Sequence, residues 1–161
     1  MTDPIVGINS RLAEPEAAAF ERGKGGPDVA ALKGEGRFAS RKTLAPKRVL
    51  IVEDNLDSVH SLVLLLQDMG HHVDYAINGY AALALAKRMR PQVVLLDLGL
   101  PGLDGFDVCK HIKADPGTRD ARVVALTGYR QEDLQAKSKA AGCDLHLVKP
   151  IDPKVLEQLL E

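Results

Sequence analysis

An uninterrupted apolar run, Val93 to Leu96, constrains the fold of this chain more than any other feature. A run this short, with no polar interruption, is typical of a strand buried on both faces in a parallel sheet. The run ends at the carboxylate of Asp97, and the stiff loop GLPG follows at 99–102. Open α/β sheets bind ligands in loops of this kind. Taken alone, Asp97 is either a functional carboxylate or an ordinary polar residue where a strand meets solvent.

Strand-like and helix-like segments alternate along residues 47–161. This alternation indicates βαβ units, and therefore one parallel sheet with helices on both faces. Right-handed crossovers place the carboxyl ends of all its strands at the same edge. The predicted strands are 48–52, 72–77, 93–96, 122–126 and 145–148; the predicted helices are 55–67 (capped by Asn55 or Asp57), 81–89 after a turn at 78–79, 104–114, 132–141 and one capped by Asp152.

The first 46 residues differ in composition from the rest. They contain six of the 14 glycines and four of the nine prolines, with few large apolar residues. Such a segment buries too little apolar surface to offset the entropy of ordering, so we predict a disordered or weakly structured extension over 1–46 and one domain over 47–161. Residues 21–48 carry eight basic and three acidic side chains, which fits a solvated tail or a contact with an acidic or phosphate-rich partner.

Overall charge and composition exclude several classes of function. A net charge of −1 and the absence of Trp argue against nucleic-acid binding and against an anionic membrane as partner. Cys109 and Cys143 form neither a disulfide framework nor a zinc motif, and we interpret them as partly buried thiols in a reducing compartment. With no apolar stretch of membrane-spanning length and no signal peptide, we expect a cytoplasmic protein.

Polar side chains follow four of the predicted strands. Glu53 and Asp54 follow the first, Asp97 the third, Thr127 the fourth and Lys149 the fifth. Clustered carboxylates need a cation among them, and oxygen-only ligands with an open side suit Mg²⁺. Lys149 can hold a phosphoryl oxygen and Thr127 can donate a hydrogen bond to another, which leaves Asp97 as a nucleophile able to carry a phosphoryl group.

Four motifs in this order resemble the receiver domains of two-component response regulators: VLIVEDN at 49–55, LLDLGLPGLDG at 95–105, ALTG at 125–128 and HLVKPID at 146–152. The resemblance covers 47–161. The sequence is most similar to receivers fused to hybrid histidine kinases, although we expect a stand-alone or detached receiver. It implies a five-stranded flavodoxin-like sheet in strand order 2-1-3-4-5.

The resemblance also implies a set of roles. Asp97 would be phosphorylated by a histidine kinase or a histidine phosphotransfer protein. Asp54, Asp97 and the backbone carbonyl of Gly99 would bind Mg²⁺, with Glu53 assisting. The domain would not be an enzyme beyond its own phosphorylation and dephosphorylation. A downstream protein would bind the face made by 132–141, 145–148 and the last helix, and we expect a monomer or weak dimer.

Further roles concern the last two strands. The resemblance implies that Thr127 and Lys149 contact the phosphoryl group, that Thr127 moves as a switch, and that the Lys149–Pro150 bond is cis. Family members often carry Tyr or Phe as a second switch residue where this chain has His146. His146 is therefore either a pivoting switch or an ordinary surface histidine.

Three other functions compete with this prediction. A magnesium-dependent phosphatase with an aspartyl nucleophile needs a second Asp, two residues after the nucleophile, as its acid and base. This chain has Gly99 at that position. A constitutive protein-binding scaffold would not need the intact set of Asp54, Asp97, Thr127 and Lys149. A flavodoxin-like nucleotide binder would carry a G-x-G-x-x-G after its first strand, and the chain has none there.

Overall fold

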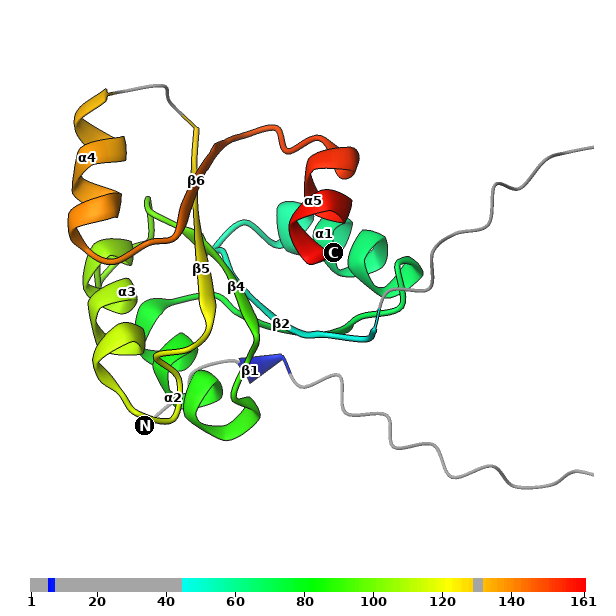
Figure 1. Ribbon diagram of the computed structural model, residues 1–161, viewed down its shortest axis with the longest axis horizontal. Helices are drawn as coiled ribbons and strands as arrows, with labels where there is room; N and C mark the ends of the chain where they lie inside the picture. The colour runs from blue at the N-terminus through cyan, green and yellow to red at the C-terminus, as the bar shows by residue number, and fades with distance from the viewer. Residues whose placement is uncertain (1–5, 8–44, 129–131) are drawn as a thin grey trace, which may run out of the picture. The chain divides into compact units, whose positions relative to one another are not determined.

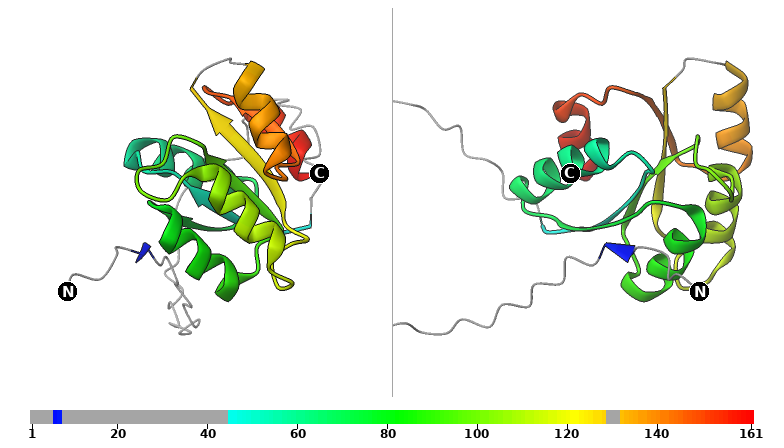
Figure 2. Two further views of the ribbon diagram at one scale, coloured as in Figure 1. Left: turned by 90° about the vertical axis from the view of Figure 1, so that its left-hand side faces the viewer. Right: turned by 180° about the vertical axis from the view of Figure 1, so that it is seen from behind.

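The computed structural model describes residues 6–7, 45–128 and 132–161. A central sheet has helices on both of its faces (Figures 1 and 2). Helices α1 and α5 cover one face, and α2, α3 and α4 lie on the other. The elements are β1 (Val6–Gly7), β2 (Arg48–Val52), α1 (Leu56–Asp68), β3 (His72–Ala76), α2 (Gly79–Met89), β4 (Val93–Asp97), α3 (Gly105–Ala114), β5 (Arg122–Thr127), α4 (Glu132–Ala140), β6 (Leu145–Val148) and α5 (Pro153–Leu160).

The sheet order among the described strands is β1-β3-β2-β4-β5-β6. The last five are parallel, which confirms the predicted fold class and the order 2-1-3-4-5. Strand β1 was not predicted; it pairs antiparallel with β3, with Val6 opposite Ala76. Apart from Val6, Gly7, Ala45 and Pro46, the predicted disordered extension lies outside the described residues.

The sheet separates two apolar cores, and consecutive residues of β4 contribute to different ones. Leu96 packs with side chains of α2 and α3, whereas Leu95 packs with side chains of α1 and α5. All five residues of β4 are buried. Because helices cover β4 on both faces, its sequence is a continuous apolar run rather than an alternating one.

Side-chain caps set where the helices start. Of the two caps predicted for α1, Asn55 is the one observed: its Oδ1 accepts the Ser58 N–H at 3.0 Å. The predicted turn at 78–79 is instead the start of α2, whose first residue is Gly79 and whose cap Asn78 accepts the Ala81 N–H at 2.8 Å. An Asn side chain satisfies free N–H groups of the first helical turn, which explains both starts.

Helix α4 buries less of its surface than the other helices do. Among its described side chains, residues 133–140, only Ser138 is buried. The turn that follows α4 is anchored more firmly, because Ala141 and Cys143 belong to the core on the α2–α3 side. The described core contacts of α4 and its following turn are therefore concentrated at the carboxyl end of the helix.

Candidate functional site

Three carboxylates lie together at the carboxyl edge of the parallel sheet. Glu53 and Asp54 follow β2, and Asp97 ends β4; one oxygen from each lies within 4.8 Å of the others. Glu53 is 1% exposed and Asp97 8%, whereas Asp54 is open to solvent. Negative charges this close favour a cation among them, and hard oxygen ligands with one exposed side are the donors that Mg²⁺ prefers. The donor set therefore fits the predicted magnesium ion.

Lys149 supplies the positive charge in this cluster. Its Nζ donates to Asp97 Oδ2 at 3.0 Å and to Glu53 Oε2. Burial lowers the pKa of Lys149, but its bonds to the two carboxylates outweigh burial and leave that pKa raised. Burial raises the pKa of Glu53, and the bonds from Lys149 and from the Asn55 N–H oppose it only in part. Lys149 is thus a fixed cation between two largely buried acids.

The loop after β4 holds Asp97 in place. The Gly99 N–H donates to Asp97 Oδ1 at 2.8 Å, so the two carboxylate oxygens have different partners. At Gly105, the first residue of α3, a Cβ would lie 2.6 Å from the Asp97 carbonyl oxygen and 2.8 Å from Leu98 Cα. Only glycine fits there, because α3 begins directly against the backbone of β4.

The strand register places Thr127 at the same edge as Asp97. Thr127 ends β5, which pairs with β4, and its carbonyl accepts the Lys149 N–H at 2.7 Å. Thr127 is buried, with 5% of the residue exposed to solvent. The Lys149–Pro150 bond is cis, as the resemblance implied. Thr127 and Lys149 therefore flank Asp97 from the two following strands.

His146 lies in a different environment from the carboxylates. It is half-buried in β6, and its Nδ1 is 3.2 Å from Ser138 Oγ on α4. Burial lowers the pKa of His146. The predicted switch position is therefore in contact with α4.

A groove beside the carboxylates was not predicted from the sequence. It encloses about 680 Å³ between α1 and the segment that joins β6 to α5. Its lining includes Glu53 and Lys149 from the carboxylate cluster together with the apolar side chains of Leu62, Leu65 and Ile151. Leu62 and Leu65 lie three residues apart on α1, a spacing that fits a core-facing stripe, although both are only partly buried and line the groove.

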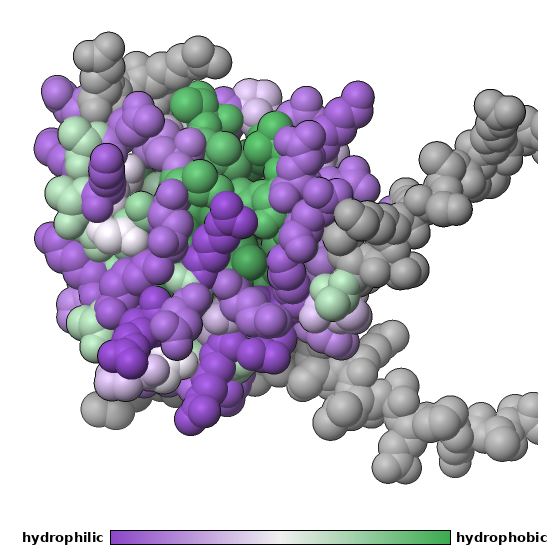
Figure 3. Space-filling model, in the orientation of Figure 1, coloured by the Kyte–Doolittle hydropathy of each residue, from purple (hydrophilic) through white to green (hydrophobic). Residues whose placement is uncertain are grey.

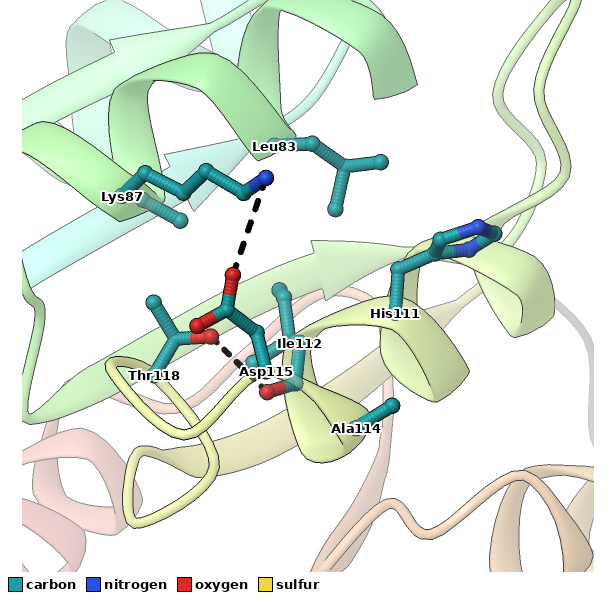
Figure 4. Close-up of a pocket in the computed structure, with 8 residues that line it drawn as sticks. Leu83, Lys87, His111, Ile112, Ala114, Asp115 and Thr118 are labelled. Carbon is teal, nitrogen blue, oxygen red and sulfur yellow. Dashed lines mark hydrogen bonds and ion pairs between the residues drawn. The ribbon is translucent and has the colours of Figure 1, made fainter.

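A smaller hollow of about 260 Å³ lies between α2 and α3 (Figure 4). Lys87 and Asp115 face each other across it, with Nζ and Oδ2 3.7 Å apart, and Thr118 Oγ1 donates to the Ile112 carbonyl at 2.8 Å. None of the predicted site residues lines it. The chemistry predicted from the sequence is therefore gathered at the sheet edge, not in this hollow.

Residues 49–161 match the response regulator receiver domain family. The chain belongs to this family. Receiver domains are phospho-accepting signalling modules of two-component systems rather than classical enzymes, and magnesium binding and phosphorelay signalling are general features of the family. The recognition made from the four sequence motifs is confirmed.

Relatives and solved structures agree with this assignment. Protein PilH of Pseudomonas aeruginosa is 36% identical over 109 residues, which cover 68% of this chain and 90% of PilH. The polar-differentiation response regulator DivK of Brucella anthropi is 33% identical, covering 71% of this chain and 94% of DivK. In PleD of Caulobacter vibrioides, 38% identical over 109 residues, the match covers 24% of the relative.

Two solved structures show the same fold. Chemotaxis protein CheY4 of Vibrio cholerae superposes with a TM-score of 0.68 at 30% identity, covering 72% of this chain and 97% of CheY4. The receiver domain of a Pseudomonas aeruginosa sensor histidine kinase, with a magnesium ion coordinated in its active-site cleft, superposes with a TM-score of 0.67 at 29% identity, covering 72% and 95%. No helix in the described part of this receiver is long and apolar enough to cross a membrane; the cytoplasmic location stays a prediction.

Proposed function

We propose that Asp97 of this receiver accepts a phosphoryl group from a histidine kinase or a histidine phosphotransfer protein, with Mg²⁺ bound at the neighbouring carboxylates. The observation that carries the proposal is the cluster of Glu53, Asp54 and Asp97 with the Lys149 ammonium on Asp97 Oδ2. Positioning and charge neutralisation dominate the catalysis of phosphoryl transfer. The reaction therefore needs a nucleophilic carboxylate, oxygen ligands for a metal ion and a fixed cation, and this cluster offers all three.

Each residue has a proposed part in the transfer. An oxygen of the ionised Asp97 attacks phosphorus, the O–P bond forms, and the P–N bond to the donor histidine breaks. Lys149 and the Thr127 hydroxyl neutralise and orient phosphoryl oxygens. Asp54, Asp97 and the Gly99 carbonyl would hold Mg²⁺, with Glu53 assisting from its buried position, and the metal would supply charge neutralisation when bound. No general base is required, since a carboxylate attacks through an oxygen that carries no proton.

The groove beside α1 is the proposed docking surface for the phosphodonor. It leads directly to Glu53 and Lys149, and its apolar lining of Leu62, Leu65 and Ile151 lies next to polar Asp57 and Ser61. A helix from a donor protein can bury its apolar face in such a groove while its histidine reaches Asp97. Among the exposed large hydrophobic side chains, Leu56 and Leu64 also belong to α1.

The α4–β6–α5 face is the proposed surface for a downstream protein. Figure 3 shows hydrophobic side chains gathered at the centre of this face, over β6 and between α4 and α5. All four residues of β6 are only half-buried, because β6 ends the sheet. Movement of Thr127 toward a phosphoryl group on Asp97 would act on β6 through their direct pairing, and would shift the population of this face between two arrangements.

The test is incubation of the full chain with acetyl phosphate, with and without Mg²⁺, read by intact mass. We expect wild-type protein to gain the mass of one phosphoryl group only when Mg²⁺ is present. Asp97→Asn abolishes the gain, and Asp107→Asn, which removes a half-exposed carboxylate from α3, keeps it. Absence of any gain under conditions that label another receiver would exclude phosphoryl acceptance and favour a constitutive scaffold.

A second arm separates the acceptor from a phosphatase. Purified protein is incubated with p-nitrophenyl phosphate and Mg²⁺, and free phosphate is measured over many equivalents of substrate. We expect at most the slow turnover that self-dephosphorylation allows, because Gly99 brings no side chain to act as acid and base. Sustained turnover that depends on Asp97 would make the protein a phosphatase instead.

A further inference from the structure

The two cysteines of the chain, far apart in sequence, meet inside the domain. Cys109 lies on α3 and is fully buried, whereas Cys143 lies in the turn between α4 and β6 and is 9% exposed. Their sulfur atoms are 3.1 Å apart across a separation of 34 residues, and both thiols are free. The chain has no other cysteine, so each is the other's sole thiol neighbour.

Polar contacts on both sides of the thiols fix their relative position. Lys113, one helical turn after Cys109, donates to Asp144 Oδ2 at 2.7 Å. The same carboxylate oxygen accepts the Val123 N–H of β5 at 2.7 Å. The Cys143 N–H donates to the Ser138 carbonyl at 2.9 Å, which ties the turn to α4. These contacts clamp the turn against α3 and keep the two sulfur atoms together.

The geometry requires little movement for a covalent bond. A disulfide has an S–S distance of about 2.05 Å, so the sulfur atoms must approach by about 1 Å. The Cys143 S–H donates to the Cys109 sulfur, and this bond lowers the pKa of Cys109 although burial opposes it. Cys143 is the more exposed thiol of the pair, and whichever sulfur is oxidised first has the other within 3.1 Å to resolve it.

We propose that Cys109 and Cys143 are a redox pair that a peroxide converts to an intramolecular disulfide, linking α3 to the turn after α4. One of the two thiolates attacks a peroxide oxygen, the O–O bond breaks, and hydroxide leaves and takes up the proton that this thiol had lost. The sulfur of the other cysteine then attacks the resulting sulfenic acid: the S–S bond forms, the S–O bond breaks, and water leaves with the proton of the second thiol. Two thiols and one hydrogen peroxide give one disulfide and two waters.

The disulfide would act on α4. It closes a loop that contains β5 and all of α4, and it fixes the end of α4 to which the weakly packed part of the helix is attached. A pinned turn restricts the motion of α4 relative to α3, so oxidation holds the α4–β6–α5 face in one arrangement. This goes beyond phosphoryl acceptance, because it adds a second input, the redox state, to the same domain.

The test treats the full-length wild-type protein with hydrogen peroxide and measures intact mass, then maps peptides under non-reducing conditions. We expect the loss of two hydrogen atoms and one cross-linked peptide containing Cys109 and Cys143, both reversed by dithiothreitol. Cys109→Ala and Cys143→Ala each abolish the loss. If either variant folds poorly, the wild-type measurement alone still tests the proposal.

The other outcomes overturn the proposal. Oxygen addition to either cysteine without a cross-link, or no change under peroxide that oxidises a reference dithiol protein, excludes the redox pair. Covalent dimers on a non-reducing gel assign the thiols to an intermolecular bond instead. Hydrogen exchange then compares the oxidised and reduced wild-type proteins: slower exchange across α4 supports the effect on the helix, and unchanged exchange there refutes it.

Discussion

Replacing Lys149 by Met removes the cation that two buried acids share. Lys149 Nζ bonds Glu53, whose side chain is 1% exposed, and Asp97, whose side chain is 12% exposed, while the Lys149 side chain itself is 29% exposed. Methionine keeps the length and apolar volume of the lysine stem, so the change acts mainly on charge. The domain then retains three clustered carboxylates with no ion-pair partner among the residues that the structure describes.

The expected cost lies between two limits. Breaking a fully buried ion pair costs about 3–5 kcal/mol, and breaking an exposed pair about 0–1 kcal/mol. Since the acids are buried but the lysine is partly solvated, we expect Lys149→Met to lower the free energy of unfolding by about 2–3 kcal/mol. For a domain of this size that corresponds to a fall in Tm of roughly 8–12 °C.

The pH dependence has a defined sign. Burial raises the pKa of Glu53 above its ordinary value of 4.5, so the folded state binds that proton more tightly than the unfolded chain does. Ionising the buried Glu53 lowers the free energy of unfolding. This loss is absent below pH 4.5 and grows as pH rises through the raised pKa of Glu53. Losing Lys149 raises that pKa further, so the deficit of the variant is largest at neutral pH and shrinks on acidification.

The assay is urea unfolding of wild type and Lys149→Met across pH, with and without Mg²⁺. Lys87→Met is the matched control: it breaks the pair with Asp115, whose charged atoms are 3.7 Å apart and whose Lys87 side chain is 70% exposed, and we expect a change below about 1 kcal/mol. Mg²⁺ should stabilise Lys149→Met more than wild type, because it replaces the missing charge. Equal stabilities of variant and wild type at every pH would refute the ion-pair reasoning.

Three further changes test other parts of the structure. Leu96→Ala, at a fully buried side chain, should cost about 2–5 kcal/mol in urea unfolding; a loss under 1 kcal/mol would contradict the tight core around β4. Burial, and then neighbouring basic groups, lowers the pKa of His71 below 6.5, so the unfolded chain binds the proton more readily and stability falls as pH drops below 6.5. His71→Gln should flatten this part of the Tm–pH profile, and an unchanged profile would locate the titration elsewhere. Gly105→Ala places a Cβ 2.6 Å from the Asp97 carbonyl oxygen; we expect about 1–3 kcal/mol of destabilisation and slower phosphoryl uptake from acetyl phosphate, whereas wild-type values would show that α3 can move away freely.

Sequence reasoning located the sheet and its edge because both depend on local patterns. Buried parallel strands have apolar sequences, and four of the five predicted strands are followed by a polar candidate residue, so the approach of Asp97 and Lys149 follows from topology alone. The bond between Lys149 and Glu53 was not predicted from the sequence, because it depends on how far these side chains reach across the edge of the sheet. The lysine had been assigned only to the phosphoryl group, and that assignment is a proposal still.

Features without a local signal escaped prediction. Strand β1 has two residues, too few for any periodicity, and exists through its pairing with β3. The contact between Cys109 and Cys143 depends on how α3 meets the turn after α4, and neither residue has a metal or redox motif beside it. The groove along α1 was hidden because Leu62 and Leu65 satisfy the pattern of a core stripe while remaining partly exposed.

The sparse packing of α4 has a consequence for protein engineering. With Ser138 the sole buried side chain among residues 133–140, the exposed positions in that range can be substituted with little effect on folding. A library confined to those positions would change the chemistry that a partner meets beside β6 while Asp97 and its neighbours stay as they are. Helix α4 is therefore the natural segment in which to redesign whom this receiver binds.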